Sequence, residues 1–165
     1  MDKSDEEIDK FFMKEAIKEA RKAYDEMEIP VGAVVVYKGE IIGRGRNRVE
    51  TLKNPLYHAE LIAIDGASKS IDAWRLIDCE LYVTLEPCAM CAGAMVNARI
   101  KRLVVGSLDP KRGCAGSLIN LLDYEGLNHK VEVELGVLEE ECRAMMQNFF
   151  KDLRNKKRVA DNSKF

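Results

Sequence analysis

Hydrophobic residues recur at three- and four-residue spacing through the first part of the chain, among lysines and glutamates. This spacing predicts an amphipathic helix packed on one face, and it is carried by Ile8, Phe11, Phe12, Ala16, Ala20, Ala23, Tyr24 and Met27. The segment 29–32 breaks the pattern, and the β-branched run 34–37 follows it. Lys38-Gly39 then separates this run from 40–42, so two antiparallel strands joined by a tight turn are expected. Residues 43–48 are interpreted as a strand end and a loop.

The middle of the chain alternates helix-like and strand-like patterns. A second helix is expected to start near His58 and to end near Asp72. Residues 81–85 form an apolar run typical of a buried strand, which leads directly into Pro87. The third helix that follows is rich in alanine and glycine up to Ala98 and can be approached closely by a neighbour.

The last third predicts two more strands and a long helix. Residues 103–106 indicate a buried strand, 109–117 a turn-rich loop, and 118–122 a short helix. Alternation over 131–135 predicts a strand with one exposed face. From Glu139 the helical period returns, with fraying expected for residues 1–6 and 159–165.

These elements predict one domain over residues 1–165, of the α/β class. Its mixed five-stranded sheet should carry helices on both faces. A chain of 165 residues can bury a sizeable core without a second domain.

Composition and charge indicate where the protein is located and which partners are expected. No apolar run approaches the roughly 20 residues of a membrane span, and the acidic start differs from a signal peptide, so we expect a cytoplasmic protein without membrane contact. The five cysteines, an odd number, favour reduced thiols over a disulfide framework. The net charge of -2 gives no general support for nucleic-acid binding. Basic residues do gather over 151–158, where a solvated helix face and a phosphate contact are both open interpretations.

Four residues carry candidate chemistry. His58, Cys88 and Cys91 supply one imidazole and two thiols, which are the ligand types that zinc prefers. A catalytic zinc commonly keeps three protein ligands and an open fourth position, whereas a structural zinc takes four. The other histidine, His129, and the other cysteines show no paired spacing, so a catalytic site is favoured over a structural zinc or a redox C-x-x-C.

Glu60 follows the imidazole by two residues. Positions i and i+2 on an ideal helix point about 200° apart, so His58 and Glu60 can share a site only at the first turn of a helix. There the carboxylate would lie near a metal without binding it. That is the position of a general acid/base that exchanges protons with an activated water.

The order of these groups, H-x-E…P-C-x-x-C, is the pattern of zinc-dependent nucleobase deaminases. The tract 76–95, together with 47–48, 115–117, 128–129 and 149–150, more specifically resembles bacterial tRNA-specific adenosine deaminases, and the likeness spans about residues 11–158. The resemblance implies a three-layer αβα cytidine-deaminase-like fold, a homodimer, and one zinc ion per subunit. It implies conversion of adenosine to inosine at the wobble position of a tRNA anticodon stem-loop, by zinc-activated water with Glu60 as the proton shuttle.

The resemblance also assigns contacts to substrate. It implies that Asn47 hydrogen-bonds the flipped nucleoside, and that a pocket wall, a loop and the last helix contact the RNA through Pro30, Val31, Ala59, Asp109, Lys111, Phe149, Phe150 and Arg154. The chain departs from the family at Leu56 and Tyr57, where two small residues are usual before the metal-binding histidine.

Two other functions stay open. The first is deamination of a free base or nucleotide of the guanine, cytosine or cytidylate type, which would proceed without RNA. The second is a non-catalytic, zinc-stabilised RNA-binding module, although such a site has no use for the carboxylate of Glu60.

Overall fold

A single five-stranded mixed sheet forms the centre of the computed structural model, which describes residues 2–164. The strands lie in the order β2-β1-β3-β4-β5. Their bounds are Gly32–Tyr37 for β1, Glu40–Arg46 for β2, Glu80–Leu85 for β3, Arg102–Ser107 for β4 and Glu132–Leu135 for β5. β1 is antiparallel to β2 and β3, whereas β3, β4 and β5 are parallel.

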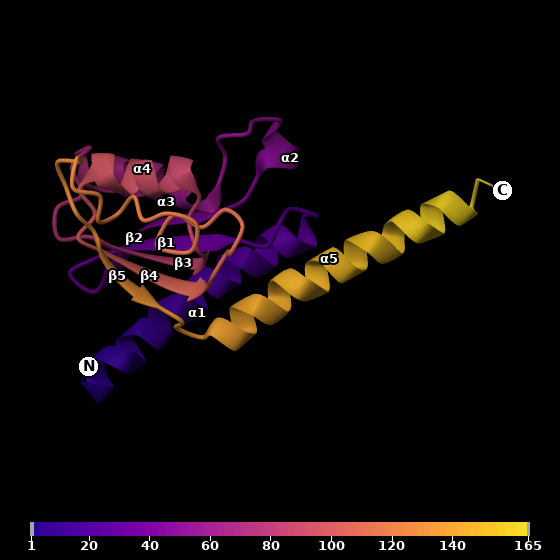
Figure 1. Cartoon of the computed structure of the whole chain (residues 1–165), viewed down its shortest axis with the longest axis horizontal. Coiled ribbons are helices and arrows are strands. Elements are labelled where there is room, and N and C mark those ends of the chain that lie inside the picture. Colours follow the sequence, from indigo (N-terminus) through magenta and orange to yellow (C-terminus); the bar gives the residue numbers. More distant parts are fainter. Residues whose placement is uncertain (1, 165) are drawn as a thin grey trace.

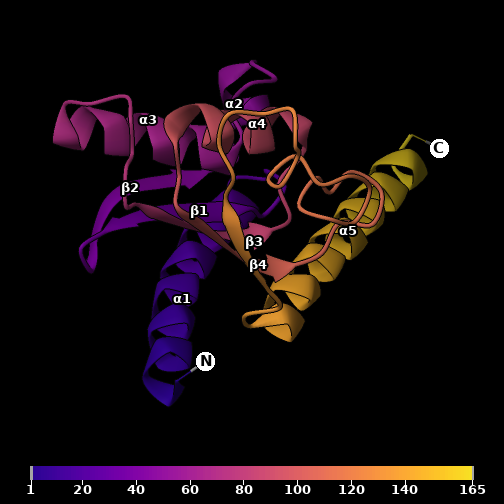
Figure 2. The same ribbon diagram turned by 60° about the vertical axis from the view of Figure 1, so that its left-hand side comes forward.

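Helices cover both faces of the sheet, which confirms the predicted three-layer arrangement (Figure 1). α1 (Lys3–Asp25) and α5 (Glu139–Asn162) lie on one face, and α3 (Ala59–Ile71) and α4 (Ala89–Ala98) lie on the other. The same separation is visible after a 60° rotation (Figure 2). A single turn, α2 (Val49–Leu52), interrupts the connection from β2 to α3. Among residues 2–164, no helix combines the length and apolar character needed to cross a bilayer.

Alternation along the strands divides the core into two clusters. In β1, Ala33 and Val35 pack with α3 and α4, while Val34 and Val36 pack toward α1 and α5. Each of these four side chains is at most 5% exposed. Because successive strand residues point to opposite faces, a continuous apolar run here serves both cores at once.

The strand end expected within residues 43–48 lies at Arg46, where β2 ends, and the loop begins at Asn47. Glycine usually weakens a strand, but at positions 43 and 45 it is required by packing. A Cβ on Gly43 would lie 2.2 Å from the carbonyl oxygen of Ala63, and one on Gly45 would lie 2.1 Å from that of Ala59. The two glycines therefore let α3 lie directly against β2.

The predicted short helix over 118–122 is wrong. A turn and an isolated bridge between Ala115 and Asn120 occupy this segment. The Asn120 side chain accepts a hydrogen bond from the backbone of Leu122 at 3.1 Å, which favours a turn over a helix. Leu118 and Ile119 point outward, with 60% and 49% of their surface exposed.

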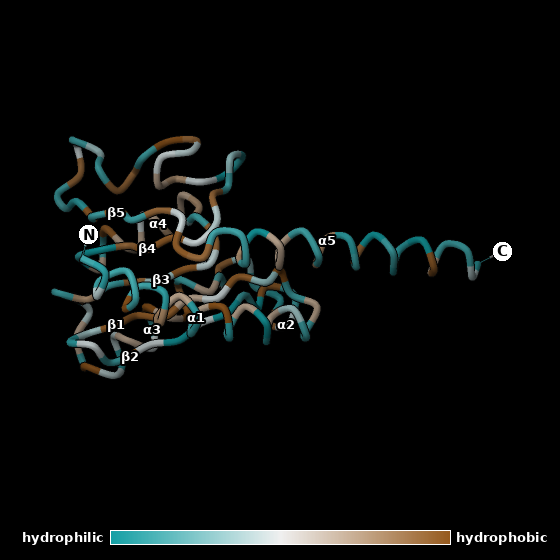
Figure 3. Tube along the Cα trace, turned by 90° about the horizontal axis from the view of Figure 1, so that it is seen from below, coloured by the Kyte–Doolittle hydropathy of each residue, from teal (hydrophilic) through white to brown (hydrophobic). Residues whose placement is uncertain are grey.

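The final helix is longer than expected, because α5 continues to Asn162 through the segment predicted to fray. At the other end, α1 begins at Lys3, inside the segment 1–6 that was expected to fray. Residues 154–162 of α5 are exposed, and this half extends away from the domain (Figure 3). Its residues are mostly hydrophilic, and none of them belongs to either core cluster.

Candidate active site

The amino ends of α3 and α4 lie close together, and a predicted metal ligand immediately precedes each helix. His58 is the N-cap of α3 and Cys88 is the N-cap of α4. The carbonyl of His58 accepts from the amide of Ile62 at 3.2 Å, and that of Cys88 accepts from the amide of Ala92 at 2.9 Å. The predicted helix starts are therefore correct to within a residue, and both ligands immediately precede the first helical residue.

The three side chains meet in one group. The ligand atoms of His58, Cys88 and Cys91 all lie within 4.8 Å of one another. Each sulfur is 3.6 Å from Nδ1 of the imidazole. Ligands at roughly 2.05 Å (N) and 2.3 Å (S) from one tetrahedral zinc would be about 3.6 Å apart, so the group fits this ion. The geometry also selects Nδ1 as the coordinating nitrogen.

The electrostatics of the group favour a thiolate. A hydrogen bond from the Cys91 thiol, and then one with His58, lowers the pKa of Cys88 to about 3. Its position at the amino end of α4 acts in the same direction, because backbone N–H groups and the helix dipole stabilise negative charge there. An ionised sulfur is the form that binds a metal.

Glu60 lies in the first turn of α3, as its spacing from the imidazole requires. Its side chain is buried, with 4% of its surface exposed. Burial raises the pKa of its carboxyl to about 7. Glu60 is absent from the group of potential ligands among residues 2–164, so a carboxyl able to exchange protons at neutral pH stands beside that group.

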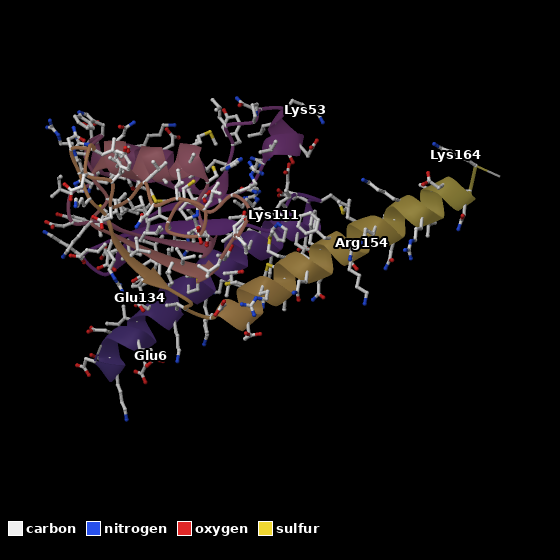
Figure 4. All side chains as sticks on the ribbon, in the orientation of Figure 1. Glu6, Lys53, Lys111, Glu134, Arg154 and Lys164 are labelled. Atoms are coloured by element: carbon white, nitrogen blue, oxygen red, sulfur yellow. The ribbon has the colours of Figure 1, made fainter. Side chains whose placement is uncertain are left out.

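A cavity of about 530 Å³ opens onto this group. Its walls include Glu60, His58 and Cys88, and five of the residues that the resemblance assigned to substrate contact: Val31, Asn47, Asp109, Phe149 and Phe150. Four other predicted site residues lie elsewhere. Pro30 and Ala59 are buried and do not line the cavity, Lys111 lines a neighbouring cavity, and Arg154 is exposed on α5 and lines neither. Figure 4 shows Lys111 on the loop after β4 and Arg154 on α5.

Sequence reasoning missed several residues of this cavity. Glu28 and Glu86 are buried acids that line it, and Arg112, Leu153 and Lys157 join them. For Leu153 and Lys157 a signal exists, since they follow Phe149 at four-residue spacing on one helix face. No sequence pattern marks the two acids.

Two side chains, Asn47 and Glu28, accept hydrogen bonds that shape the cavity on the β2 side. Asn47 accepts from the amide of Ala59 at 2.9 Å. Glu28 accepts from the amide and the hydroxyl of Thr51 at 2.6 and 2.9 Å, which anchors α2 beside the cavity. The unusual Leu56 and Tyr57 are 56% and 38% exposed and do not line the cavity, so these large side chains leave it open.

The fold and the His-Cys-Cys group together define a deaminase domain. The family model of MafB19-like deaminases matches residues 7–154. A tRNA-specific adenosine deaminase of Bacillus subtilis (strain 168) is 54% identical over 152 residues, covering 92% of this chain and 94% of the relative. The chain belongs to the MafB19-like deaminase family, within its tRNA-specific adenosine deaminases.

Two solved structures of deaminases are similar to this chain. One, from work on A-to-I editing by tRNA:A34 deaminases at the wobble position of transfer RNA, superposes with a TM-score of 0.79 and 40% identity, covering 82% of this chain and 98% of that one. A guanine deaminase from Bacillus subtilis gives a TM-score of 0.57 and 38% identity, with 66% of each chain covered.

Proposed function

We propose that this protein deaminates adenosine to inosine at the wobble position of a tRNA anticodon. The observation that carries the proposal is the full-length likeness to tRNA-specific adenosine deaminases, at 54% identity, combined with a cavity that opens onto the His-Cys-Cys group. The reaction adds water at C6 of adenine and releases the amino group as ammonia. As an enzyme acting on tRNA, the protein would work in the cytoplasm.

The resident metal in this proposal is one zinc ion per subunit, held by His58, Cys88 and Cys91. The separations of 3.6 Å between Nδ1 and each sulfur support this ligand set. When bound, zinc would activate a water as the nucleophile, because the pKa of a coordinated water falls to roughly 7. Two thiolates and a neutral imidazole would balance the charge of the ion.

Glu60 is the proton carrier in this proposal. Its buried carboxylate takes a proton from the attacking water and delivers it to the ring nitrogen next to C6. It then transfers a second proton to the departing amine, so that ammonia leaves and inosine remains. A pKa of about 7 suits both transfers at neutral pH, since the group can accept and release protons readily.

Substrate contacts divide between the cavity and its rim. Val31 and Asn47 lie in the wall beside Glu60 and are placed to surround a flipped base. Asp109, Phe149 and Phe150 lie at the loop and helix that border the cavity, where they would contact neighbouring nucleotides. Phe150 is 38% exposed, so its ring is available for stacking on a base.

The same proposal includes a homodimer. A shallow groove on the outer side of α3 and α4 is lined in part by Leu61, Ile64, Trp74 and Ala94. Trp74 is 59% exposed, so a large apolar side chain on this face is available for contact. We expect Trp74→Glu to shift the protein from dimer to monomer in light scattering. An unchanged mass would remove this face from the dimer proposal.

Deamination of free guanine is the second candidate, favoured by the 38% identity to a guanine deaminase. One experiment separates the two. Purified protein is incubated with an anticodon stem-loop bearing adenosine at the wobble position, and separately with free adenosine, guanine and cytidine, while ammonia and inosine are assayed. Inosine formed only in the RNA supports the first proposal. Ammonia released only from a free base selects the second proposal. If no substrate releases ammonia, the non-catalytic RNA-binding module is the remaining interpretation.

A further inference from the structure

The carboxylate of Glu86 is buried at the end of β3, one residue before Pro87 and two before Cys88. Only 3% of the residue surface is exposed. Its backbone amide donates to the carbonyl of Ser107 at 2.8 Å, which extends the pairing of β3 with β4. A buried carboxylate requires hydrogen-bond donors, and here they come from a single loop.

That loop is the segment 109–117. The Ser117 hydroxyl donates to Oε1 of Glu86 at 2.5 Å, and the amides of Ala115 and Ser117 approach Oε2 at 3.4 and 3.3 Å. Gly113 passes against the same carboxylate, since a Cβ there would lie 1.7 Å from Oε2. The loop therefore folds around the Glu86 side chain, and glycine is required at the closest point.

The other end of the loop reaches the cavity. The carbonyl of Asp109 accepts from the amide of Gly113 at 2.8 Å, and its Oδ1 accepts from the amides of Lys111 and Arg112 at 3.2 Å each. Asp109 and Arg112 both line the cavity that Glu60 borders. The loop is thus held at both ends: residues 115 and 117 donate to Glu86, residues 111–113 donate to Asp109, and Gly113 packs against the Glu86 carboxylate between them.

We propose that Glu86 is a positioning residue for the RNA substrate: it fixes the loop 109–117 so that Asp109 and Arg112 face the nucleotides next to the reacting base. This inference rests on the proposed function for its substrate. Glu86 holds neither the metal nor the reacting atoms, because both of its oxygens are engaged by the loop. Its loss should therefore weaken substrate binding more than it slows chemistry.

The test uses two variants. Ser117→Ala removes one hydrogen-bond donor from the loop. Glu86→Gln replaces one of the two accepting oxygens with an NH2 group, so the side chain can no longer accept from all three donors in the same way. Ser70→Ala, an exposed serine in the last turn of α3, is the matched control. The measurements are kcat and KM on the anticodon stem-loop, zinc content, and hydrogen exchange of the amides over 109–117.

We expect Ser117→Ala to raise KM about tenfold, because hydrogen bonds to charged groups are among the stronger ones. The kcat should change by less than about twofold, and the loop amides should exchange about tenfold faster. Glu86→Gln should do the same to a greater degree with zinc retained, and Ser70→Ala should match the parent protein.

An unchanged KM and unchanged exchange in Ser117→Ala would overturn the proposal, even if Glu86→Gln fails to fold. A fall in kcat with constant KM would also overturn it, because Glu86 would then act on chemistry. Hydrogen exchange needs no substrate. If the parent protein failed to act on RNA, the proposed function would fail and the substrate role of Glu86 with it, while exchange would still decide whether Glu86 holds the loop.

Discussion

The side-chain oxygen of Asn47 accepts a hydrogen bond from the backbone N–H of Ala59 at 2.9 Å. Ala59 lies between His58 and Glu60, so this bond holds the segment that carries both groups. The N-cap residue of α3, His58, makes no side-chain cap of its own. Asn47 therefore satisfies a free helix donor from a neighbouring segment, and the end of β2 orients the active site.

This relationship predicts different outcomes for two substitutions at Asn47. Asn47→Ala removes the acceptor and should lower the free energy of unfolding by about 1 kcal/mol, with a loss of turnover. Asn47→Asp keeps an acceptor at a helix N-terminus and should retain stability. If the Asn47 amide also donates to the nucleoside, Asn47→Asp will be stable but slow. Denaturant unfolding and steady-state kinetics measure both effects, and an Asn47→Ala protein as stable as the parent would exclude the capping role.

Glu60→Gln tests the proton carrier. Gln has nearly the same shape but cannot exchange protons, so the variant should fold, hold stoichiometric zinc, and lose about 10²- to 10⁴-fold in rate. Metal analysis and single-turnover inosine formation are the measurements. Glu40→Gln, on the exposed hairpin, is the matched control and should keep the parental rate. A Glu60→Gln protein with normal turnover would mean that another group moves the protons.

Removing a ligand should separate metal binding from folding. Cys88→Ala should lose zinc, whereas Cys114→Ala, which removes a buried thiol outside the ligand group, should keep it. A bound metal stabilises the folded state by mass action, so a chelator should lower the Tm of the parent and of Cys114→Ala but not that of Cys88→Ala. Elemental analysis and thermal unfolding give both readouts. Full zinc loading of Cys88→Ala would refute the ligand set.

The raised pKa of the buried Cys142 thiol predicts that the protein loses stability at high pH. This thiol is buried on α5, and burial, followed by the charge of Glu141, raises its pKa from 9.0 to about 12. Above about pH 9 the unfolded chain releases this proton while the folded protein keeps it, so stability is full below pH 9 and falls between 9 and 12. Denaturant unfolding at about pH 8 and pH 10 should show a smaller decline for Cys142→Ala than for the parent. Equal declines would assign the pH dependence to other groups.

The sequence predicted those parts of the fold that depend on local pattern. Hydrophobic spacing places α1, α3 and the first hairpin, because the buried face of each element repeats with the period of its own backbone. The need for glycine at positions 43 and 45 could not be predicted, since it arises from the backbone of α3, which would lie 2.2 and 2.1 Å from an added Cβ. That contact exists only after β2 and α3 have packed.

Some residues of the candidate site could likewise be predicted from the sequence, and others could not. His58, Glu60 and the two cysteines are recognisable because metal chemistry restricts residue types and spacing. Glu28 and Glu86 carry no such signal, since an acidic residue is expected at the surface until another segment of the chain supplies its hydrogen-bond donors. The sequence shows the helical period of α5. It does not show which basic residue of α5 faces the cavity, because that depends on how the helix packs against the rest of the domain.

The orientation of α5 distinguishes two of its basic residues. Lys157 lines the cavity together with Phe149, Phe150 and Leu153, whereas Arg154 does not. Lys157→Gln should therefore raise KM for the anticodon stem-loop and reduce the slope of log affinity against log salt by about 0.7 to 0.9, the value for one phosphate contact. Arg154→Gln should have the smaller effect, and Lys14→Gln, exposed on α1, should have none. Binding is measured by titration at several salt concentrations. An unchanged slope in Lys157→Gln would show that this residue contacts no phosphate, and a larger change in Arg154→Gln would mean that the RNA follows the other side of α5.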